Sequence, residues 1–431
     1  MKNFVEASTF CHLVTDGTHN SPKKTNDGVL LVTSKNITNG KLDLSKSYYI
    51  SKDDAIEINK RSKVNKFDIL ISMIGTVGEV CFIDQEPNFV VKNVGILKNK
   101  DKFHAKWLYF YLKSQEAQNI IKERLNGTTQ QYLSLGELRK LPILKPISEN
   151  HLINTVEILD NFEKKITLNT QTNQTLEQIA QAIFKHWFID FAPVHAKANA
   201  LARGETIEQA ELAAMACLSG KTAEKITALK TQDPTAYHQL QQTAAAFPSE
   251  FVETEMGLVP KGWEVKKIDE VIQKIPVGKK YSQKTTVPDG KIPVLDQGKS
   301  GIIGFHNDTA GVNASIQDPV IVFANHTCYM RLIHFDFSAI QNVFAFKGQS
   351  INIYWLYLAT LGKQTFVEYK GHFPDFLIKQ IVVPPKELTE IFGNLVQNSF
   401  SKIALNLENN AILAKTRDLL LPKLLNGEVE L

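Results

Sequence analysis

The sequence predicts an α+β protein with two homologous α/β domains, each followed by a long helix, and the two helices pairing as an antiparallel coiled coil. Two observations predict this architecture. Residues 1–150 and 255–385 carry the same motifs in the same order, and a segment with heptad spacing follows each block. A repeated block of this size indicates two copies of one structural unit, each with its own core.

The repeat between the two blocks is carried by aromatic and polar strings. Residues 107–109 (WLY) of the first block match residues 355–357 (WLY) of the second, and Asn93-Val94 matches Asn342-Val343. Because these strings keep their order, we expect both blocks to share one topology.

Each block mixes strands with a helix. Runs rich in β-branched residues, such as 68–72 (DILIS) and 319–323 (PVIVF), predict buried strands. The segment 103–114 (FHAKWLYFYLKS) repeats its apolar residues at helical spacing, which indicates an amphipathic helix. Each block is therefore expected to be an α/β domain.

A helical segment follows each block, at 151–195 and 386–431. An offset of 237 residues matches the two segments and pairs Asn169 with Asn406 and Asn173 with Asn410. The matched positions alternate by three and four residues, which is the spacing of a coiled-coil seam. A buried asparagine in such a seam fixes the register of the two helices. The alternative is that these asparagines lie at the edge of the seam and are solvated.

Residues 196–254 lie between the first helical segment and the second block. They are rich in Ala, Gln and Glu, which predicts further helices, and they have no counterpart after the second copy. We interpret this segment as a helical connector or insertion.

Composition excludes several classes of protein. Of 431 residues, 43% are hydrophobic and 22% are charged, which is ordinary for a globular chain. No apolar run reaches the roughly 18–20 residues of a membrane helix, so we expect no membrane partner. The first residues lack the apolar core of a signal peptide, and the four cysteines are far apart. These features predict a cytoplasmic protein without a disulfide framework.

Positive charge is concentrated in the two blocks. Residues 1–150 hold 22 Lys and Arg against 16 Asp and Glu, and residues 255–385 hold 14 against 11. Residues 186–254 hold 5 against 8. Two mildly basic blocks are compatible with a polyanionic partner, although such charge is common.

No motif in the chain predicts catalysis. The sequence has no GxxxxGKS/T phosphate loop, no HExxH, no zinc spacing of Cys and His, and no GxSxG nucleophile. We therefore predict no catalytic residue, no metal site and no cofactor on this chain. Three alternatives stay open: a nuclease or methyltransferase with an unrecognised active site, a tandem-domain DNA-binding regulator without enzymatic partners, and a coiled-coil scaffold.

Polar loops in both blocks suit contact with DNA. Lysine neutralises phosphate, Gln and Asn pair with adenine, and Thr contacts phosphate or a thymine methyl group. The candidate DNA-binding residues of the first block are Thr18, His19, Lys23, Lys24, Ser72, Gly75, Thr76, Thr128, Thr129 and Gln130. Those of the second block are Gln297, Lys299, Asn325, His326, Lys370 and His372. The alternative for any one loop is a polar turn, and the recurrence of such loops in both blocks favours DNA binding.

Three aromatic residues, Trp187, Phe188 and Phe191, lie within five positions of one another. Such a cluster is typical of an interface hot spot and equally of core packing. We predict a partner-binding site here, with core packing as the alternative.

Several strings in the chain are similar to those of one known family. They include 70–78 (LISMIGTVG), 127–130 (GTTQ), 187–191 (WFIDF), 257–263 (GLVPKGW) and 421–428 (LPKLLNGE). Taken in this order and with the duplicated architecture, the chain resembles the DNA-specificity subunit of type I restriction-modification systems over essentially its whole length.

The resemblance implies a division of the chain into five parts. These are a first target-recognition domain at 1–150, a first conserved helical region at 151–195, the connector at 196–254, a second target-recognition domain at 255–385 and a second conserved helical region at 386–431. The second block has residues 323–326 where the first has 72–75, and 371–374 where the first has 127–130. These departures prevent the transfer of base contacts from one block to the other.

The resemblance also implies a non-catalytic subunit that reads a bipartite, asymmetric target in double-stranded DNA. Such a subunit holds two methylation subunits, which bind S-adenosylmethionine, and through them restriction subunits that use ATP and Mg²⁺. The paired helices would act as a spacer between the domains. A single helix over 151–187 would measure about 55 Å at about 1.5 Å per residue, against about 34 Å for one turn of B-DNA.

Overall fold

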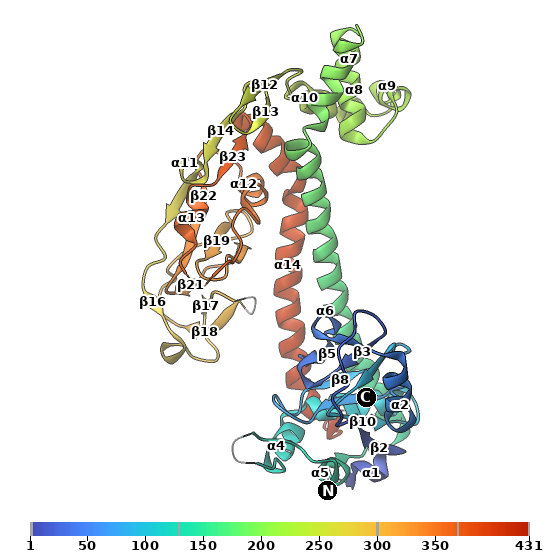
Figure 1. The fold of residues 1–431 in the computed structure, drawn as a ribbon. Coiled ribbons are helices and arrows are strands. Elements are labelled where there is room, and N and C mark those ends of the chain that lie inside the picture. Colours follow the sequence, from blue (N-terminus) through green and yellow to red (C-terminus); the bar gives the residue numbers. More distant parts are fainter. Residues whose placement is uncertain (1–2, 128–129, 299–300, 369, 430–431) are drawn as a thin grey trace. The chain divides into compact units, whose positions relative to one another are not determined.

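The computed structural model describes residues 3–127, 130–298, 301–368 and 370–429 (Figure 1). The chain divides into two compact units. Unit 1 comprises Met1–Asn169 and Glu408–Leu431, and unit 2 comprises Thr170–Leu407. Among the described residues, no helix combines the length and the apolar character needed to cross a membrane.

Unit 1 is built on an antiparallel sheet of strand order β2-β10-β7-β8. A second sheet of order β6-β3-β9, two short strand pairs and the α-helices α1 to α5 make up the rest of the globular domain among the described residues. The strands are β1 (Phe4–Glu6), β2 (Leu13–Asp16), β3 (Val29–Val32), β4 (Ile37–Thr38), β5 (Lys41–Leu42), β6 (Tyr48–Ile50), β7 (Ile69–Ser72), β8 (Val80–Phe82), β9 (Phe89–Val91), β10 (Val94–Lys98) and β11 (Pro142–Leu144). The helices are α1 (Ala7–Phe10), α2 (Lys52–Ser62), α3 (Lys102–Lys113), α4 (Gln115–Glu123) and α5 (Leu135–Arg139).

Helix α3 is the centre of the unit 1 core. The Asp101 carboxylate accepts hydrogen bonds from the backbone N–H groups of Phe103 and His104 at 2.8 and 3.0 Å, which starts the helix. Trp107 is fully buried, and its indole N–H donates to the carbonyl of Leu144 at 2.7 Å. The aromatic string found in the sequence is therefore a core element.

Unit 2 repeats this plan. Its main sheet has the order β15-β22-β19-β20, and a second sheet has the order β16-β21-β17-β18. The strands of the domain are β14 (Glu264–Lys267), β15 (Ile272–Ile275), β16 (Lys280–Tyr281), β17 (Ile292–Leu295), β18 (Ile302–His306), β19 (Val320–Ala324), β20 (Met330–Ile333), β21 (Ser338–Ile340), β22 (Val343–Gly348) and β23 (Gln380–Val383). Its helices are α11 (Ile268–Val271), α12 (Ile353–Thr360) and α13 (Phe373–Leu377), and a hairpin of β12 (Phe251–Thr254) and β13 (Gly257–Pro260) precedes them.

The strand pairing confirms the predicted duplication and corrects its alignment. In unit 1, Val94 pairs with Ser72, and in unit 2, Val343 pairs with Ala324. Ser72 therefore corresponds to Ala324, one residue later than the sequence comparison places it. The match between 127–130 and 371–374 is also wrong. The N–H of Leu133 donates to the carbonyl of Met73, and the N–H of His372 donates to the carbonyl of Asn325. His372 therefore corresponds to Leu133.

Two long helices, α6 (Glu149–Phe184) and α14 (Lys386–Leu425), form an antiparallel pair within each unit. In unit 1, Asn169 donates to Asn410 at 2.9 Å, and in unit 2, Asn406 donates to Asn173 at 2.8 Å. Asn169, Asn173 and Asn406 are 5%, 9% and 2% exposed, so the solvated alternative for them is wrong. The asparagines lie inside the seam and pair across it.

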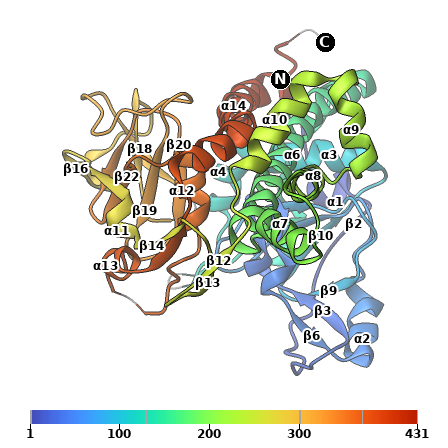
Figure 2. The same cartoon turned by 90° about the horizontal axis from the view of Figure 1, so that it is seen from above.

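The connector is helical, as its composition predicts. Helix α6 runs into a π-helical turn at Lys185–Ile189, and α7 (Ala192–Ala202), α8 (Ile207–Ser219), α9 (Ala223–Gln232) and α10 (Pro234–Ala245) follow. The four helices lie together in both views (Figures 1 and 2). A small core of Ala214, Met215, Ile226 and Ala244 joins α8, α9 and α10.

Candidate nucleic-acid interface

In unit 1, the loops singled out in the sequence meet at one end of the main sheet. Strand β2 ends at Asp16, β7 ends at Ser72, and their common neighbour β10 begins at Val94. Because neighbouring strands are antiparallel, these three termini lie at the same end of the sheet. The loop that follows α4 joins them, since Tyr132 forms a bridge with Ile74. The fold therefore gathers chain segments about 20, 75 and 130 into one surface.

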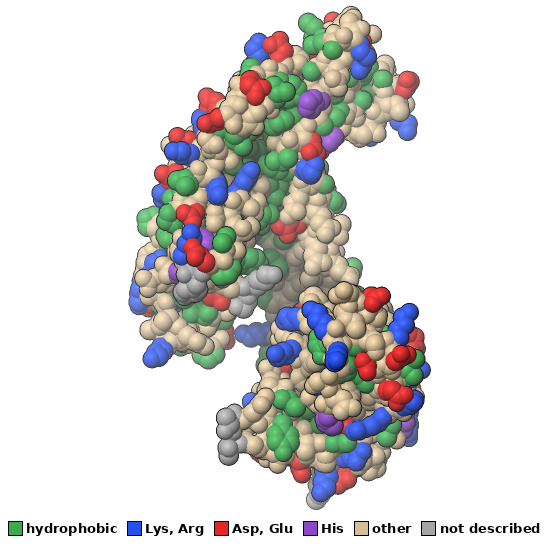
Figure 3. Space-filling view, viewed as in Figure 1, with side chains coloured by type: hydrophobic (Ala, Val, Ile, Leu, Met, Phe, Trp, Pro, Cys, Tyr) green, Lys and Arg blue, Asp and Glu red, His purple; other side chains and the backbone are tan. Residues whose placement is uncertain are grey.

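Most candidate residues of unit 1 are exposed to solvent. His19, Lys23, Lys24, Gly75, Thr76 and Gln130 are exposed, and Thr18 is half-buried. Figure 3 shows Lys and Arg side chains spread over this unit, with Asp and Glu side chains among them. Thr128 and Thr129 lie outside the described residues.

Ser72 is wrongly assigned to the DNA-binding set. Its side chain is fully buried, donates a hydrogen bond to the carbonyl of Thr76 at 2.5 Å and accepts one from the N–H of Glu79 at 2.9 Å. The hydroxyl is therefore used to shape the loop that carries Gly75 and Thr76, and it has no surface with which to contact DNA.

Unit 2 gathers its candidate loops in the same way. The N–H of His326 donates to the side-chain oxygen of Gln297 at 2.8 Å, and the His326 Nδ1 lies 2.8 Å from the carbonyl of Lys370. The N–H of His372 donates to the carbonyl of Asn325 at 3.0 Å. Three loops that are far apart in the sequence thus form one cluster at the end of β19. Lys299 lies outside the described residues.

Two candidates of unit 2 are structural. Asn325 is 7% exposed, and its side-chain oxygen accepts the N–H of Phe373 at 2.8 Å. His372 is fully buried, with Nε2 3.0 Å from the carbonyl of Glu368. These two assignments are wrong, because buried polar side chains that bond the backbone hold the loop and cannot reach DNA. Gln297 and His326 are half-buried, and Lys370 is exposed.

Sequence reasoning missed an asparagine that supports each cluster. Asn93 and Asn342 precede β10 and β22 with left-handed φ values of 52° and 65°, a conformation that asparagine tolerates better than most residues. Asn93 Oδ1 lies 2.8 Å from Nδ1 of His19, and Asn342 Nδ2 lies 3.0 Å from Nε2 of His326. The Asn-Val repeat in the sequence is the signal for these positions, because the same turn occurs twice.

Arg331 supports the loop that carries Gln297. Its guanidinium donates to the carbonyls of Gly301 and Asp296 at 2.9 and 2.7 Å. Burial lowers the pKa of this side chain. Arg331 therefore fixes the backbone of the loop in unit 2.

The aromatic segment after α6 is core. Trp187 and Phe188 are 4% and 2% exposed, and the Phe188 ring lies 5.3 Å from Phe392 and 5.9 Å from Trp355. Phe191 is half-buried against Trp263. The partner-binding assignment is thus wrong for Trp187 and Phe188, because rings packed into the core have no face left for another protein.

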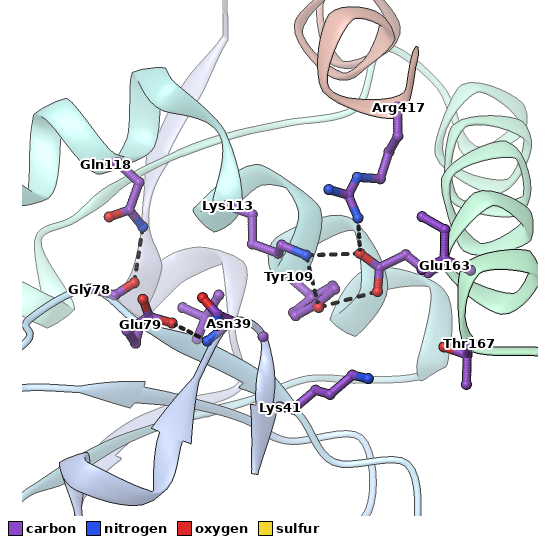
Figure 4. Close-up of a pocket in the computed structure, with 13 residues that line it drawn as sticks. Asn39, Lys41, Gly78, Glu79, Tyr109, Lys113, Gln118, Glu163, Thr167 and Arg417 are labelled. Carbon is purple, nitrogen blue, oxygen red and sulfur yellow. Dashed lines mark hydrogen bonds and ion pairs between the residues drawn. The ribbon is translucent and has the colours of Figure 1, made fainter. Parts of the chain in front are cut away.

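A polar joint in unit 1 attaches α3 to both long helices (Figure 4). The Glu163 carboxylate of α6 accepts Lys113 of α3 at 2.8 Å and Arg417 of α14 at 2.9 Å. Burial alone would raise the pKa of Glu163, but these two cations outweigh it and hold the pKa below its ordinary value. A hollow of about 410 Å³ adjoins the joint, with Asn39, Lys41, Glu79 and Gln118 on its far side.

The chain is similar in sequence to known proteins. The family model described as "Type I restriction modification DNA specificity domain" matches residues 3–178. The HindI specificity subunit of Haemophilus influenzae, a type I restriction enzyme subunit, is 34% identical over 420 residues, covering 86% of this chain and 88% of the relative. The MjaIX specificity subunit of Methanocaldococcus jannaschii is 23% identical, covering 77% and 70%.

A solved structure shares the fold. The crystal structure of the type I restriction-modification S subunit from M. genitalium has a TM-score of 0.50 and 16% identity, covering 98% of this chain and 96% of that one. At this identity the likeness concerns the fold alone. The sequence match to the HindI subunit over most of both chains settles the family: the chain belongs to the specificity subunits of type I restriction enzymes.

Proposed function

We propose that each globular domain reads one half of a bipartite, asymmetric target in double-stranded DNA. The observation that carries the proposal is the placement of the polar loops. Within each unit, these loops come from separate stretches of the chain and gather at one end of the main sheet. The two main sheets have the same strand order, and the loops lie at the same end of both. A shared scaffold with divergent loops is the arrangement expected of two domains that read different base sequences.

The two domains also differ in the sheet that supports these loops. Gly95 follows Val94 in unit 1, where an added Cβ would lie 2.6 Å from Leu138. The corresponding residue after Val343 in unit 2 is Phe344, whose ring stacks on Phe373 at 4.1 Å. The same position is thus closed in one domain and filled by an aromatic ring in the other, so the sheets beneath the loops differ between the two domains.

The chemistry of the exposed groups supports contact with DNA. Lys23 and Lys24 lie beside the loop that carries His19, where they would neutralise phosphates and set the register of the domain. Thr76 and Gln130 are exposed and offer donors and acceptors for base edges.

We also propose that the chain holds two methylation subunits and, through them, restriction subunits, and that it carries out no catalysis itself. S-adenosylmethionine, ATP and Mg²⁺ would then act on those partners. Leu168 in unit 1 and Leu405 in unit 2 support two equivalent docking sites. They are related by the offset of 237 residues, and they are 56% and 43% exposed on α6 and α14. Exposed leucines at repeat-related positions suit two copies of one partner.

Methylome sequencing tests the proposed function. A host expressing this chain with its cognate methylation subunit is compared with a host that lacks the chain. We expect N6-methyladenine at one asymmetric split motif, and only when the chain is present. The absence of any chain-dependent motif would refute the proposal, once the same methylation subunit has been shown to be active with another specificity subunit.

A further inference from the structure

Three charged or ionisable side chains converge at the end of β2 in unit 1. The Asp16 carboxylate is 3% exposed. Its Oδ1 accepts Nη2 of Arg61 at 2.5 Å, and its Oδ2 lies 3.0 Å from Nε2 of His19. Arg61 comes from the last turn of α2, so the contact joins two elements that are 45 residues apart in the sequence.

The position of the carboxylate is fixed by the backbone around it. Asp16 pairs with Gly95 of the neighbouring strand, and a Cβ added at Gly17 would lie 2.5 Å from the carbonyl of Val91. On the other side, His19 is held by Asn93 at 2.8 Å. A buried carboxylate in a paired strand is a rigid anchor, because it can neither move nor remain without cationic partners.

Arg61 is held by this anchor but stays accessible. Its side chain is 60% exposed, so the guanidinium is tied through one nitrogen while much of it faces solvent. A free arginine must lose much rotational freedom when it binds, and a carboxylate that fixes the side chain beforehand removes part of that cost. The pair Arg61–Asp16 is neutral overall, which makes it a poor phosphate clamp and leaves directional hydrogen bonding as its useful property.

We propose that Arg61 reads a guanine in the half-site of the first domain, with Asp16 as the positioning residue. The inference rests on the proposed function, because it requires that this end of the sheet faces DNA. A guanidinium donates two parallel hydrogen bonds to O6 and N7 of guanine, an acceptor pair that no other base presents in the major groove. Arg61 lies beside the loops that carry His19, Lys23 and Lys24, where phosphate contacts would bring the groove to it.

The second domain lacks this device. The register of β15 and β22 places Pro276 where unit 1 has Asp16, since Ile275 pairs with Ala345. Proline offers no carboxylate to hold an arginine. The guanine contact is therefore confined to the half-site that the first domain reads.

The test is the methylome of hosts that express variants of the full chain with the cognate methylation subunit. Arg61→Ala should make one guanine position in one half-site degenerate, and Arg61→Lys should do the same, because an ammonium cannot make the paired contact. Asp16→Asn should weaken the preference at that same position. Lys60→Ala is the matched control: Lys60 precedes Arg61 on α2, is 65% exposed and pairs with Glu57, and its loss should leave the motif unchanged.

A binding measurement on purified complexes with methylation subunits adds a readout that begins with the unaltered chain. Each guanine of the half-site is replaced in turn by 7-deazaguanine, which lacks the N7 acceptor. One replacement should weaken binding by the wild-type complex about 10-fold or more, and should have little further effect on the Arg61→Ala complex.

Two outcomes would overturn the inference. Uniformly reduced methylation by Arg61→Ala with an unchanged motif would make Arg61 a phosphate contact or a structural tie between α2 and β2. Equal sensitivity of wild-type and Arg61→Ala complexes to every 7-deazaguanine would exclude base reading. A wild-type chain that directs methylation to no motif would instead refute the proposed function, and this inference with it.

Discussion

The side-chain amide of Asn169 donates a hydrogen bond to the side-chain oxygen of Asn410 at 2.9 Å, and the internal repeat reproduces this contact within unit 2. Adding 237 to Asn169 gives Asn406, which donates to Asn173 at 2.8 Å. The other two asparagines also make matching contacts. Asn410 donates to the carbonyl of Ile166, and Asn173 donates to the carbonyl of Ile403, both at 3.4 Å. One pattern of polar contacts is therefore encoded twice.

Breaking one of these pairs is expected to destabilise the chain more than removing it entirely. Asn406→Leu leaves the buried side-chain oxygen of Asn173 without the donor it has in the seam, which should lower the free energy of unfolding by about 1–3 kcal/mol. The double variant Asn173→Leu with Asn406→Leu should recover most of this loss, because apolar residues pack well in the seam. Urea unfolding of the single and double variants measures both effects. A single variant as stable as wild type would show that the buried amide needs no partner.

Glu163 should contribute to stability at neutral pH and lose that contribution in acid. Its pKa is lowered in the folded chain, so the contribution is present above the ordinary carboxyl range and disappears as the pH falls through the folded pKa. Glu163→Gln should cost about 2 kcal/mol at pH 7 and flatten the acid dependence of the free energy of unfolding. Denaturant melts at several pH values measure this change.

Glu57→Gln is the control for that measurement. Glu57 also pairs with a lysine, but its side chain is 69% exposed, so its loss should leave the melts nearly unchanged. Equal effects from both variants would mean that the joint between α3, α6 and α14 adds nothing beyond a surface ion pair.

Lys23 and Lys24 are expected to contribute to affinity without contributing to sequence preference. Replacing either by alanine should weaken binding to all DNA sequences, and should reduce the slope of log K against log salt by about one. Titrations of the complex with methylation subunits at several salt concentrations test this. Lys60→Ala is the control, because it also removes one positive charge but from helix α2. A changed methylation motif in either variant would point to base contact instead.

The effect of Phe188→Ala on stability distinguishes core packing from partner docking. The ring is buried among Trp187, Trp355 and Phe392, so Phe188→Ala should lower the free energy of unfolding by about 3–5 kcal/mol. Recovery of methylation subunits in a pull-down should fall only in proportion to the amount of folded chain. Loss of pull-down from a chain of unchanged stability would restore the partner-binding interpretation.

The duplicated architecture could be predicted from the sequence because the repeated residues belong to the two cores. Trp107 and Trp355 are both fully buried on α3 and α12, and such positions tolerate few alternatives. The asparagines were predictable for a related reason, since a polar residue that recurs at heptad spacing signals register. The predicted alignment of the two blocks was wrong by one residue at Ser72. Comparing short sequence strings does not show which residues pair across neighbouring strands, and that pairing fixes the alignment.

The candidate surface was predicted in outline, but individual side chains were not. The three loops of each block do come together, yet Ser72, Asn325 and His372 turn inward to bond the backbone. Loop sequences do not separate a polar side chain that shapes a turn from one that faces solvent. Arg61 was missed because its partner Asp16 is distant in the sequence and only the fold brings them together.

The length of the paired helices is expected to set the number of unread bases between the half-sites. Seven residues inserted after position 171 in α6 and after position 408 in α14 preserve the seam and both asparagine pairs. The insertion adds about 10 Å at about 1.5 Å per residue, which corresponds to about three base pairs at about 3.4 Å each. Methylome sequencing should therefore show unchanged half-sites with a longer gap. The same insertion beside Gly220, between α8 and α9, should leave the gap as it is. An unchanged gap in the helix variant, with methylation intact, would mean that contacts outside the helix pair determine the spacing.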